Sequence, residues 1–157
     1  AMIWRGPMGQ SALIQMLDDV DWPELDILVL DMPPGTGDIQ LTTAQRIPLN
    51  GAVVVSTPSA LAQADVRRAR AMFEKTNVPV LGLVENMAFM TAPDGTRLHP
   101  FGNPSTDTLM SLPLDAEIHA AAETGVPVVI DAPQSAAALA FGELARKLIE
   151  LLEGGKT

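Results

Sequence analysis

The sequence predicts an α/β fold, a mostly parallel sheet flanked by helices, and three observations lead to it. Short apolar runs at residues 27–30, 52–56 and 80–84 have the composition of strands buried on both faces. Stretches with helical periodicity separate these runs, and each connection is long enough for a crossover between parallel strands. With 157 residues, of which 47% are hydrophobic, the chain is expected to form a single domain over residues 1–157.

The remaining elements follow in chain order. A first helix is expected over residues 7–20, with Pro7 in its first turn, and helices are also expected at 39–47, 60–75, 117–123 and 135–152. Asp38 is expected to cap the second helix. The segment 92–105 is rich in proline and glycine and predicts an irregular loop or a small hairpin around Pro93, Asp94 and Gly95. A weaker strand is expected at 109–114 and an extended stretch at 126–130.

The segment 25–38, LDILVLDMPPGTGD, joins an apolar run to a glycine-rich turn that carries two acids. Asp31 is expected at the carboxyl end of its strand, the edge where open α/β sheets bind ligands, and an acid there suits a phosphate-bound Mg²⁺. Gly35 and Gly37 permit a close backbone approach to phosphate. The alternative is an ordinary strand-to-helix turn with Asp38 as a helix cap.

Several blocks in order, WRGPM at 4–8, LDILVLDMPPGTGD at 25–38, GAVVVSTPSALAQADVRRA at 51–69 and GLVENM at 82–87, resemble the Mrp/ApbC family of iron–sulfur cluster carrier ATPases. That family belongs to the MinD-like branch of P-loop NTPases, and the resemblance extends over residues 4–141. It implies ATP and Mg²⁺ as cofactors, ATP hydrolysis, a homodimer and iron–sulfur acceptor proteins as partners. In many members a Cys-x-x-Cys pair holds the cluster across the dimer.

The resemblance also implies roles for individual residues. Asp31 corresponds to the Walker B acid, which holds Mg²⁺ through water, Gly35 to the glycine that senses the γ-phosphate, and Asp38 to a polar group near the reaction centre or the dimer face. Asn86 corresponds to the asparagine that reads the adenine edge, and Pro133 is expected to pack on the base. For Asn86 a turn-forming side chain that bonds to its own backbone remains the alternative.

Two departures from the family pattern limit these expectations. The chain contains no G-x-x-x-x-G-K-[ST] phosphate loop, so the fold is expected to be incomplete on its amino-terminal side, with an uncovered sheet edge that favours self-association. It also contains no cysteine, so this chain cannot ligate a cluster through thiolates. Isolated ATP–Mg²⁺ binding is therefore expected to be weak, because the missing loop would supply a lysine and a row of N–H donors.

Charge and hydropathy exclude other classes. The net charge of −9 disfavours binding to nucleic acid or to an anionic membrane, and no apolar run is long enough to span a bilayer, so a cytoplasmic protein is expected. Arg67, Arg68 and Arg70 predict either a site for an acidic partner or a solvated helix face. His99 and His119 are isolated and predict no metal site.

Three functional hypotheses remain. The first is an ATP-binding and ATP-hydrolysing iron–sulfur cluster carrier or assembly factor, inactive alone because it lacks the phosphate loop. The second is a non-catalytic partner-binding module built on the same sheet. The third is a MinD- or ParA-like positioning ATPase, which the acidic charge and the lack of a basic amphipathic helix disfavour.

Overall fold

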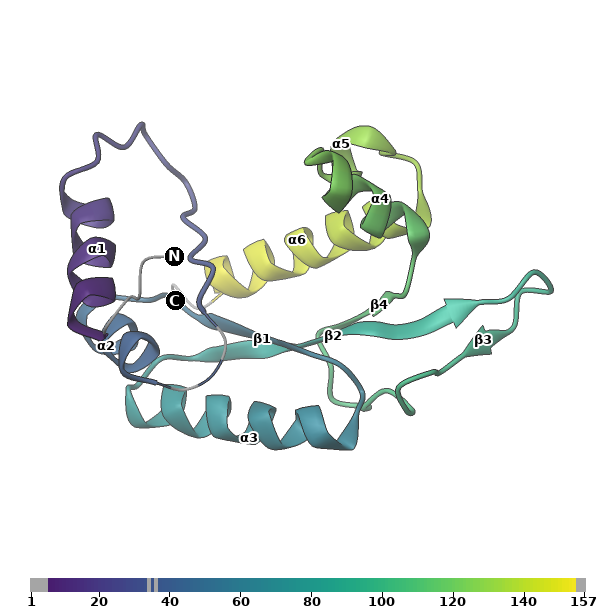
Figure 1. The fold of residues 1–157 in the computed structure, drawn as a ribbon, viewed down its shortest axis with the longest axis horizontal. Helices are drawn as coiled ribbons and strands as arrows, with labels where there is room; N and C mark the ends of the chain where they lie inside the picture. The colour runs from purple at the N-terminus through teal and green to yellow at the C-terminus, as the bar shows by residue number, and fades with distance from the viewer. Residues whose placement is uncertain (1–5, 34, 36, 155–157) are drawn as a thin grey trace.

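The computed structural model describes residues 6–33, 35 and 37–154 of the chain (Figure 1). The sequence motif WRGPM therefore lies partly outside the described residues, as do Pro34 and residues 155–157. Within the described part, the elements run in the order α1 (Gly6–Asp18), α2 (Asp38–Arg46), β1 (Ala52–Ser56), α3 (Ala60–Lys75), β2 (Val80–Thr91), β3 (Arg97–Leu98), β4 (Met110–Pro113), α4 (Ala116–Thr124), α5 (Val128–Asp131) and α6 (Ala136–Gly154).

The sheet has β2 at its centre. Strand β1 pairs with β2 in parallel, β4 pairs with the other edge of β2, also in parallel, and β3 adds a short antiparallel pairing at the far end of β2. Helix α3 makes the crossover from β1 to β2, as parallel pairing requires. In Figure 1, α3 and α6 lie on opposite sides of the strands, so the predicted α/β architecture is confirmed.

The main apolar core lies between α3 and the sheet. Its buried members share one cluster that includes Val54 of β1, Leu83 of β2 and Phe73 of α3. A second, smaller cluster joins α4, α5 and α6 around Ala137, which is fully buried. Because two separate elements of the sheet face the first cluster, the positions of β1 and β2 relative to each other are fixed by burial as well as by hydrogen bonds.

The segment before α2 departs from the prediction. Residues 27–30 do not form a strand, and their side chains are largely exposed, with Val29 at 83%. A strand requires a neighbour that accepts and donates its backbone hydrogen bonds. Among the described strands β1 pairs only with β2, so this segment forms no ladder with the edge of the sheet. The expectation of a buried strand at 27–30 is wrong for this structure.

Two smaller predictions also need correction. The cap of α2 is Gly37, and Asp38 is the first residue of the helix and not its cap. The stretch 126–130 was expected to be extended, but Val128–Asp131 forms the short helix α5 after Pro127. Its apolar side chain Val128 is buried in the α4–α6 cluster, so tertiary packing outweighs the extended preference of β-branched residues.

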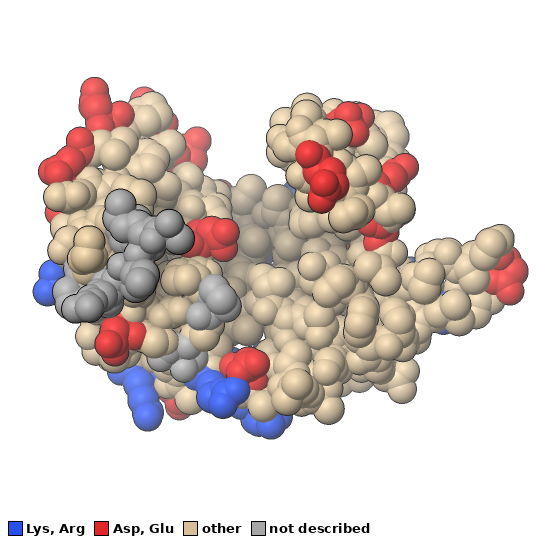
Figure 2. Space-filling model, in the orientation of Figure 1, with Lys and Arg blue, Asp and Glu red and all other residues tan. Residues whose placement is uncertain are grey.

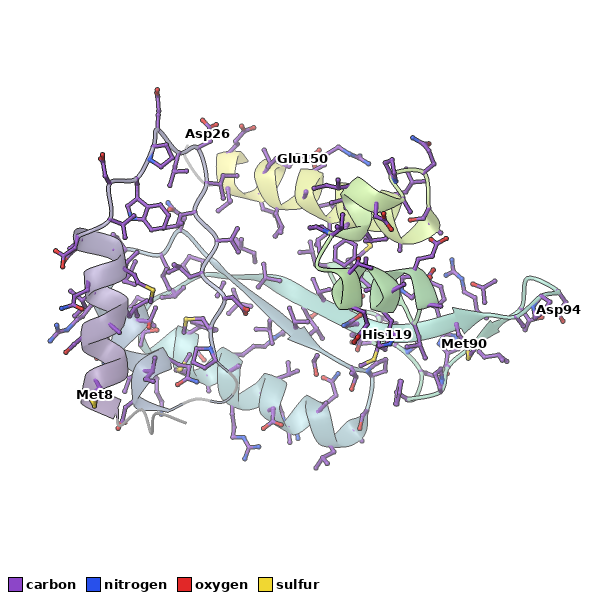
Figure 3. The ribbon with its side chains drawn as sticks, turned by 45° about the horizontal axis from the view of Figure 1, so that its top comes forward. Met8, Asp26, Met90, Asp94, His119 and Glu150 are labelled. Atoms are coloured by element: carbon purple, nitrogen blue, oxygen red, sulfur yellow. The ribbon has the colours of Figure 1, made fainter. Side chains whose placement is uncertain are left out.

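A two-stranded arm extends from the sheet at the end of β2. It comprises the end of β2, the turn at 92–96 and β3, with Met90 opposite Leu98 and Thr91 opposite Arg97. The predicted hairpin around Asp94 is thus confirmed, and Figure 3 shows Asp94 at the tip of the arm, away from the body of the protein.

Candidate functional site

The carboxyl-terminal edge of the parallel sheet is the expected ligand site, because open α/β sheets bind their ligands there. At this edge Ser56 of β1 is paired with Glu85 of β2, and Glu85 is paired in turn with Ser111 of β4. Glu85 has no exposed surface. Because Glu85 pairs with a residue on each side, and the next residues of β2 do not, it is the last position at which all three parallel strands are in register.

Strand β2 is bulged directly after this point. While β2 advances from Glu85 to Phe89, β4 advances only from Ser111 to Pro113, so β2 carries two extra residues. Met87 in this bulge has a φ of 54°, a left-handed conformation that is rare for residues other than glycine. Bulges of this kind re-aim side chains and are frequent beside active sites.

Asn86 lies in the bulge and is half-buried. Its Oδ1 accepts a hydrogen bond from the backbone N–H of Met87 at 2.9 Å, which supports the unusual conformation there. Among the described residues, its Nδ2 donates to no partner. Asn86 therefore makes the backbone contact that the sequence left open as an alternative, and its Nδ2 group is still available to a ligand.

The acidic group at 31–38 lies on a different part of the chain. Asp31 is exposed and follows a segment that is outside the sheet, so it does not stand at the end of a strand as expected. Gly35 has a φ of 100°, which confirms that this turn needs glycine. The carbonyl oxygen of Pro33 accepts from Gln40 Nε2 at 2.9 Å, so the turn is attached to the first part of α2.

Asp38 and Pro133 complete the set of predicted residues. Asp38 begins α2, whose cap Gly37 supplies no side-chain acceptor to the first-turn N–H groups. Pro133 is exposed in the turn between α5 and α6. The predicted site residues thus come from three regions: the turn before α2, the bulge of β2 and the turn before α6. Their assignment to one site remains a prediction.

Sequence reasoning missed the side chains that surround Glu85. Gln63 Nε2 donates to Glu85 Oε1 at 3.3 Å, and the backbone N–H of Ser105 donates to Oε1 and Oε2 at 3.2 and 3.0 Å. The only signal in the sequence is an acid at the end of the apolar run that forms β2, which gives no indication of its partners. His99, expected to be an ordinary exposed residue, is exposed, and its Nδ1 lies 2.9 Å from the carbonyl oxygen of Ala88.

A shallow pocket lies at the other end of the sheet. It has a volume of about 320 Å³ and is lined by residues 44–49 and 76–78, which precede β1 and β2. Since these are the amino ends of the parallel strands, the pocket does not coincide with the bulge of β2. It is therefore a separate feature and not part of the candidate site.

The donor groups of the described residues decide which cofactors they fit. No group of three or more His, Asp or Glu side chains within the described residues is arranged to hold a metal ion. The whole sequence lacks cysteine, so an iron–sulfur cluster finds no thiolate here. An amide with a free N–H donor fits the edge of a purine base, whereas the acids near α2 fit a cation bound to phosphate.

Comparison with known proteins identifies close relatives. The iron–sulfur cluster carrier protein of Pseudomonas fragi is 47% identical over 154 residues, which cover 92% of this chain and 54% of the relative. An iron–sulfur protein required for NADH dehydrogenase in mitochondria of Arabidopsis thaliana is 42% identical, with 97% and 52% coverage. The chain thus spans about half the length of these relatives.

Solved structures agree with this likeness. A nucleotide-binding protein from Archaeoglobus fulgidus in complex with ADP is 38% identical, with a TM-score of 0.64 and coverage of 74% of this chain and 52% of that protein. The cell division ATPase MinD of Pyrococcus furiosus has a TM-score of 0.69 over 96% of this chain and 63% of its own, at 20% identity, which shows the shared fold.

A family model also matches the chain. It is the ParA model, described as NUBPL iron-transfer P-loop NTPase, and it matches residues 1–149, nearly the whole chain. Together with the α/β fold and the related carrier proteins, this match shows that the chain belongs to the NUBPL iron-transfer family of P-loop NTPases.

Proposed function

We propose that this chain is part of an ATP-dependent iron–sulfur cluster carrier and that it supplies the base-binding edge of the nucleotide site. The observation that carries the proposal is the half-buried Asn86 amide, which the β2 bulge displays at the carboxyl end of the parallel sheet with its Nδ2 unpaired among the described residues. Support comes from the related carrier proteins and from the related nucleotide-binding protein that was solved with ADP.

The chemistry of Asn86 suits adenine. A carboxamide that donates from nitrogen and accepts at oxygen matches the N7 acceptor and the N6 amino group of adenine. Guanine presents an O6 acceptor in place of the amino group, so the same amide meets it with one unfavourable contact. Oδ1 accepts one hydrogen bond from Met87, and a carbonyl oxygen has a second lone pair for the base. Pro133, exposed before α6, is proposed to pack on the base face.

The turn before α2 is proposed to meet the phosphates and their metal. When bound, Mg²⁺–ATP supplies the phosphoryl group, and the metal neutralises the charge that develops on it. Asp31 would hold the metal through water, and Gly35 together with the amino-terminal end of α2 would approach the phosphate. Asp38 would orient polar groups beside them.

This chain alone is proposed to bind nucleotide weakly. Asp31 and Asp38 place negative charge where the phosphates would lie, so a triphosphate without metal is repelled. The carrier function further requires thiolates that this chain does not contain, so we propose that the cluster is held by groups outside it. A homodimer, iron–sulfur acceptor proteins and a cytoplasmic location complete the proposal.

Nuclear magnetic resonance titration with Mg²⁺–ATP tests the base site, because it detects millimolar binding. We expect the Asn86 side-chain amide to shift on binding, and we expect Asn86→Ala to weaken ATP binding by about 5-fold or more, the lower end of the range for one bidentate base contact. The matched control is Asn103→Ala, which removes the same amide from an exposed position and should leave the dissociation constant unchanged. Equal binding by both variants would place the base elsewhere.

A partner-binding module is the second candidate, and one observation favours it. The projecting arm exposes Met90 at 40%, Leu98 at 49% and the following Phe101 at 43%. Figure 3 shows Met90 on the arm, outside the body of the protein. A two-stranded ribbon has little stability of its own, and apolar side chains on it suit a docking contact. Replacing Met90 and Leu98 by threonine would abolish partner capture under this function but leave nucleotide titrations unchanged.

The positioning-ATPase alternative has less support. The likeness to MinD at 20% identity concerns the fold alone. None of the helices within the described residues combines the length and apolar composition needed to cross a bilayer. The relatives of 42–47% identity are iron–sulfur proteins, so the carrier function is the one we propose.

A further inference from the structure

Glu85 is a carboxylate with no exposed surface and with no cationic partner among the described residues. The ion pairs of the described residues join Arg68 with Asp65, Arg70 with Asp107, and Lys147 with Glu143, and none includes Glu85. Burying a carboxylate is unfavourable unless hydrogen bonds replace its lost water. A position that keeps such a group in the centre of the sheet therefore requires an explanation beyond packing.

The partners of Glu85 are all N–H donors from elsewhere in the chain. Gln63 Nε2, in the first turns of α3, donates to Oε1 at 3.3 Å, and it also lies 3.4 Å from the carbonyl oxygen of Thr57, in the turn after β1. The Ser105 N–H, in the segment before β4, donates to both carboxylate oxygens. Carboxylate oxygens accept hydrogen bonds, and each of these contacts comes from an N–H donor.

These contacts connect three segments at one edge of the sheet. The turn from β1 into α3, the end of β2 and the segment that returns from the arm to β4 meet at the same carboxylate. We name the group formed by Gln63, Glu85 and Ser105 the Glu85 clasp. Charge-assisted hydrogen bonds are stronger and more directional than neutral ones, so the clasp fixes these segments relative to one another.

The bulge that displays Asn86 begins at the residue after the clasp. Its geometry depends on where β2 leaves the register with β4, and Glu85 is the last residue in register. Met87 retains its left-handed backbone although the side chain disfavours it. Strained conformations of this kind persist only when their surroundings hold them, and the clasp is the adjacent fixed point.

We infer that Glu85 is a positioning residue that acts through Asn86 and sets the selectivity of the site for adenine over guanine. This inference rests on the proposed function. If the clasp loosens, the bulge gains freedom, and the Asn86 amide adapts to guanine as well as to adenine. The phosphate contacts lie on another part of the chain, so the overall affinity changes less than the ratio between the two bases.

The test compares ATP and GTP titrations, each with Mg²⁺, followed by nuclear magnetic resonance on the full chain. Glu85→Gln keeps the shape but places an NH₂ group against an N–H donor of the clasp. We expect the ratio of the GTP to the ATP dissociation constant to fall at least about 3-fold, which is part of the 5-fold or larger discrimination given by a bidentate contact. The Ser105 amide proton should also move upfield, because it loses a charged acceptor.

Two further variants separate positioning from general damage. Glu74→Gln removes an exposed acid from α3 and should leave the ratio unchanged. The double variant Gln63→Glu/Glu85→Gln exchanges the carboxylate and the amide, so one donor and one acceptor again face each other between positions 63 and 85. The carboxylate at position 63 cannot donate to the Thr57 carbonyl oxygen, so the ratio should recover in part. If Glu85→Gln does not fold, Gln63→Met removes one donor of the clasp and should lower the ratio by a smaller factor.

The outcomes distinguish this inference from the proposed function. If Asn86→Ala leaves the ratio unchanged, the base site itself is wrong. If Asn86→Ala abolishes the discrimination while folded Glu85→Gln, or Gln63→Met in its place, retains the full ratio, the base site stands and the positioning role of Glu85 is refuted. A ratio that falls with Glu85→Gln and recovers in the double variant supports the inference.

Discussion

Adding one methyl group at Gly82 tests the contact between β2 and β4. A Cβ at this position would lie 2.8 Å from Leu109 Cβ, closer than unstrained carbon atoms approach. Leu109 directly precedes β4 and cannot move away freely, because its N–H donates to the carbonyl oxygen of Leu83 at 2.8 Å. Gly82→Ala therefore either strains this hydrogen bond or shifts β4 along β2.

The expected cost follows from the overlap. Overpacking of a filled site costs about 1–3 kcal/mol. A loss of about 2 kcal/mol in the free energy of unfolding lowers the Tm of a domain of this size by roughly 4–8 °C. Differential scanning calorimetry or thermal circular dichroism on the purified chain measures this shift.

Gly142→Ala is the matched control, since it adds the same methyl group within helix α6. Within the part of the chain that the structure describes, no heavy atom outside the helix lies within 4 Å of the added Cβ, and alanine is favoured over glycine inside a helix. We expect a gain of about 0.5–1 kcal/mol. A Tm that Gly82→Ala leaves unchanged or raises would refute the close approach of β2 and β4, and with it the register that places Ser111 beside Glu85.

Three further predictions concern the edge and the arm. Because β1 pairs on one side only and residues 27–30 are exposed, the chain should self-associate, and sedimentation velocity showing monomer at every concentration would contradict this. Hydrogen bonds from Thr96, chiefly from its backbone N–H and then from its side chain, lower the pKa of Asp94 below the ordinary 3.8. The turn is therefore stabilised above that pH and loses this stabilisation as the pH falls. The chemical shift of the Thr96 amide should report this titration, and Asp94→Asn should remove the pH dependence. Arg97 lies over the Phe89 ring at 4.2 Å, so Arg97→Ala should weaken the arm by about 0.5–1 kcal/mol, seen as faster amide exchange in the arm, while Arg97→Lys should retain part of the contact.

The elements built from local pattern and short crossovers could be predicted from the sequence. Strand β1 and helix α3 have the predicted ends, because an apolar run followed by a helical stripe determines both locally. The hairpin turn was also predictable, since Pro93, Asp94 and Gly95 favour it. The helix α5 was not, because its burial against α6 depends on residues far along the chain.

The candidate site was predictable only in part. A resemblance to a carrier family pointed to Asn86, but the bulge that displays it depends on the register between β2 and β4, which single-sequence periodicity does not specify. The partners of Glu85 come from residues 63 and 105, which the sequence does not connect with position 85. The strand expected at 27–30 failed for a related reason, because an apolar run becomes a strand only beside a neighbour.

The unequal lengths of the sheet strands have a consequence for local opening. Strand β2 has 12 residues, whereas β1 has five and β4 four, so β2 extends past both parallel neighbours into the arm. The amides of its first half should exchange with solvent only on global unfolding, and those of its last residues by fraying of the short β3 pairing. The arm shown in Figure 1 is therefore a low-stability unit on a rigid base, and it can rearrange against a partner without disturbing the edge at Glu85.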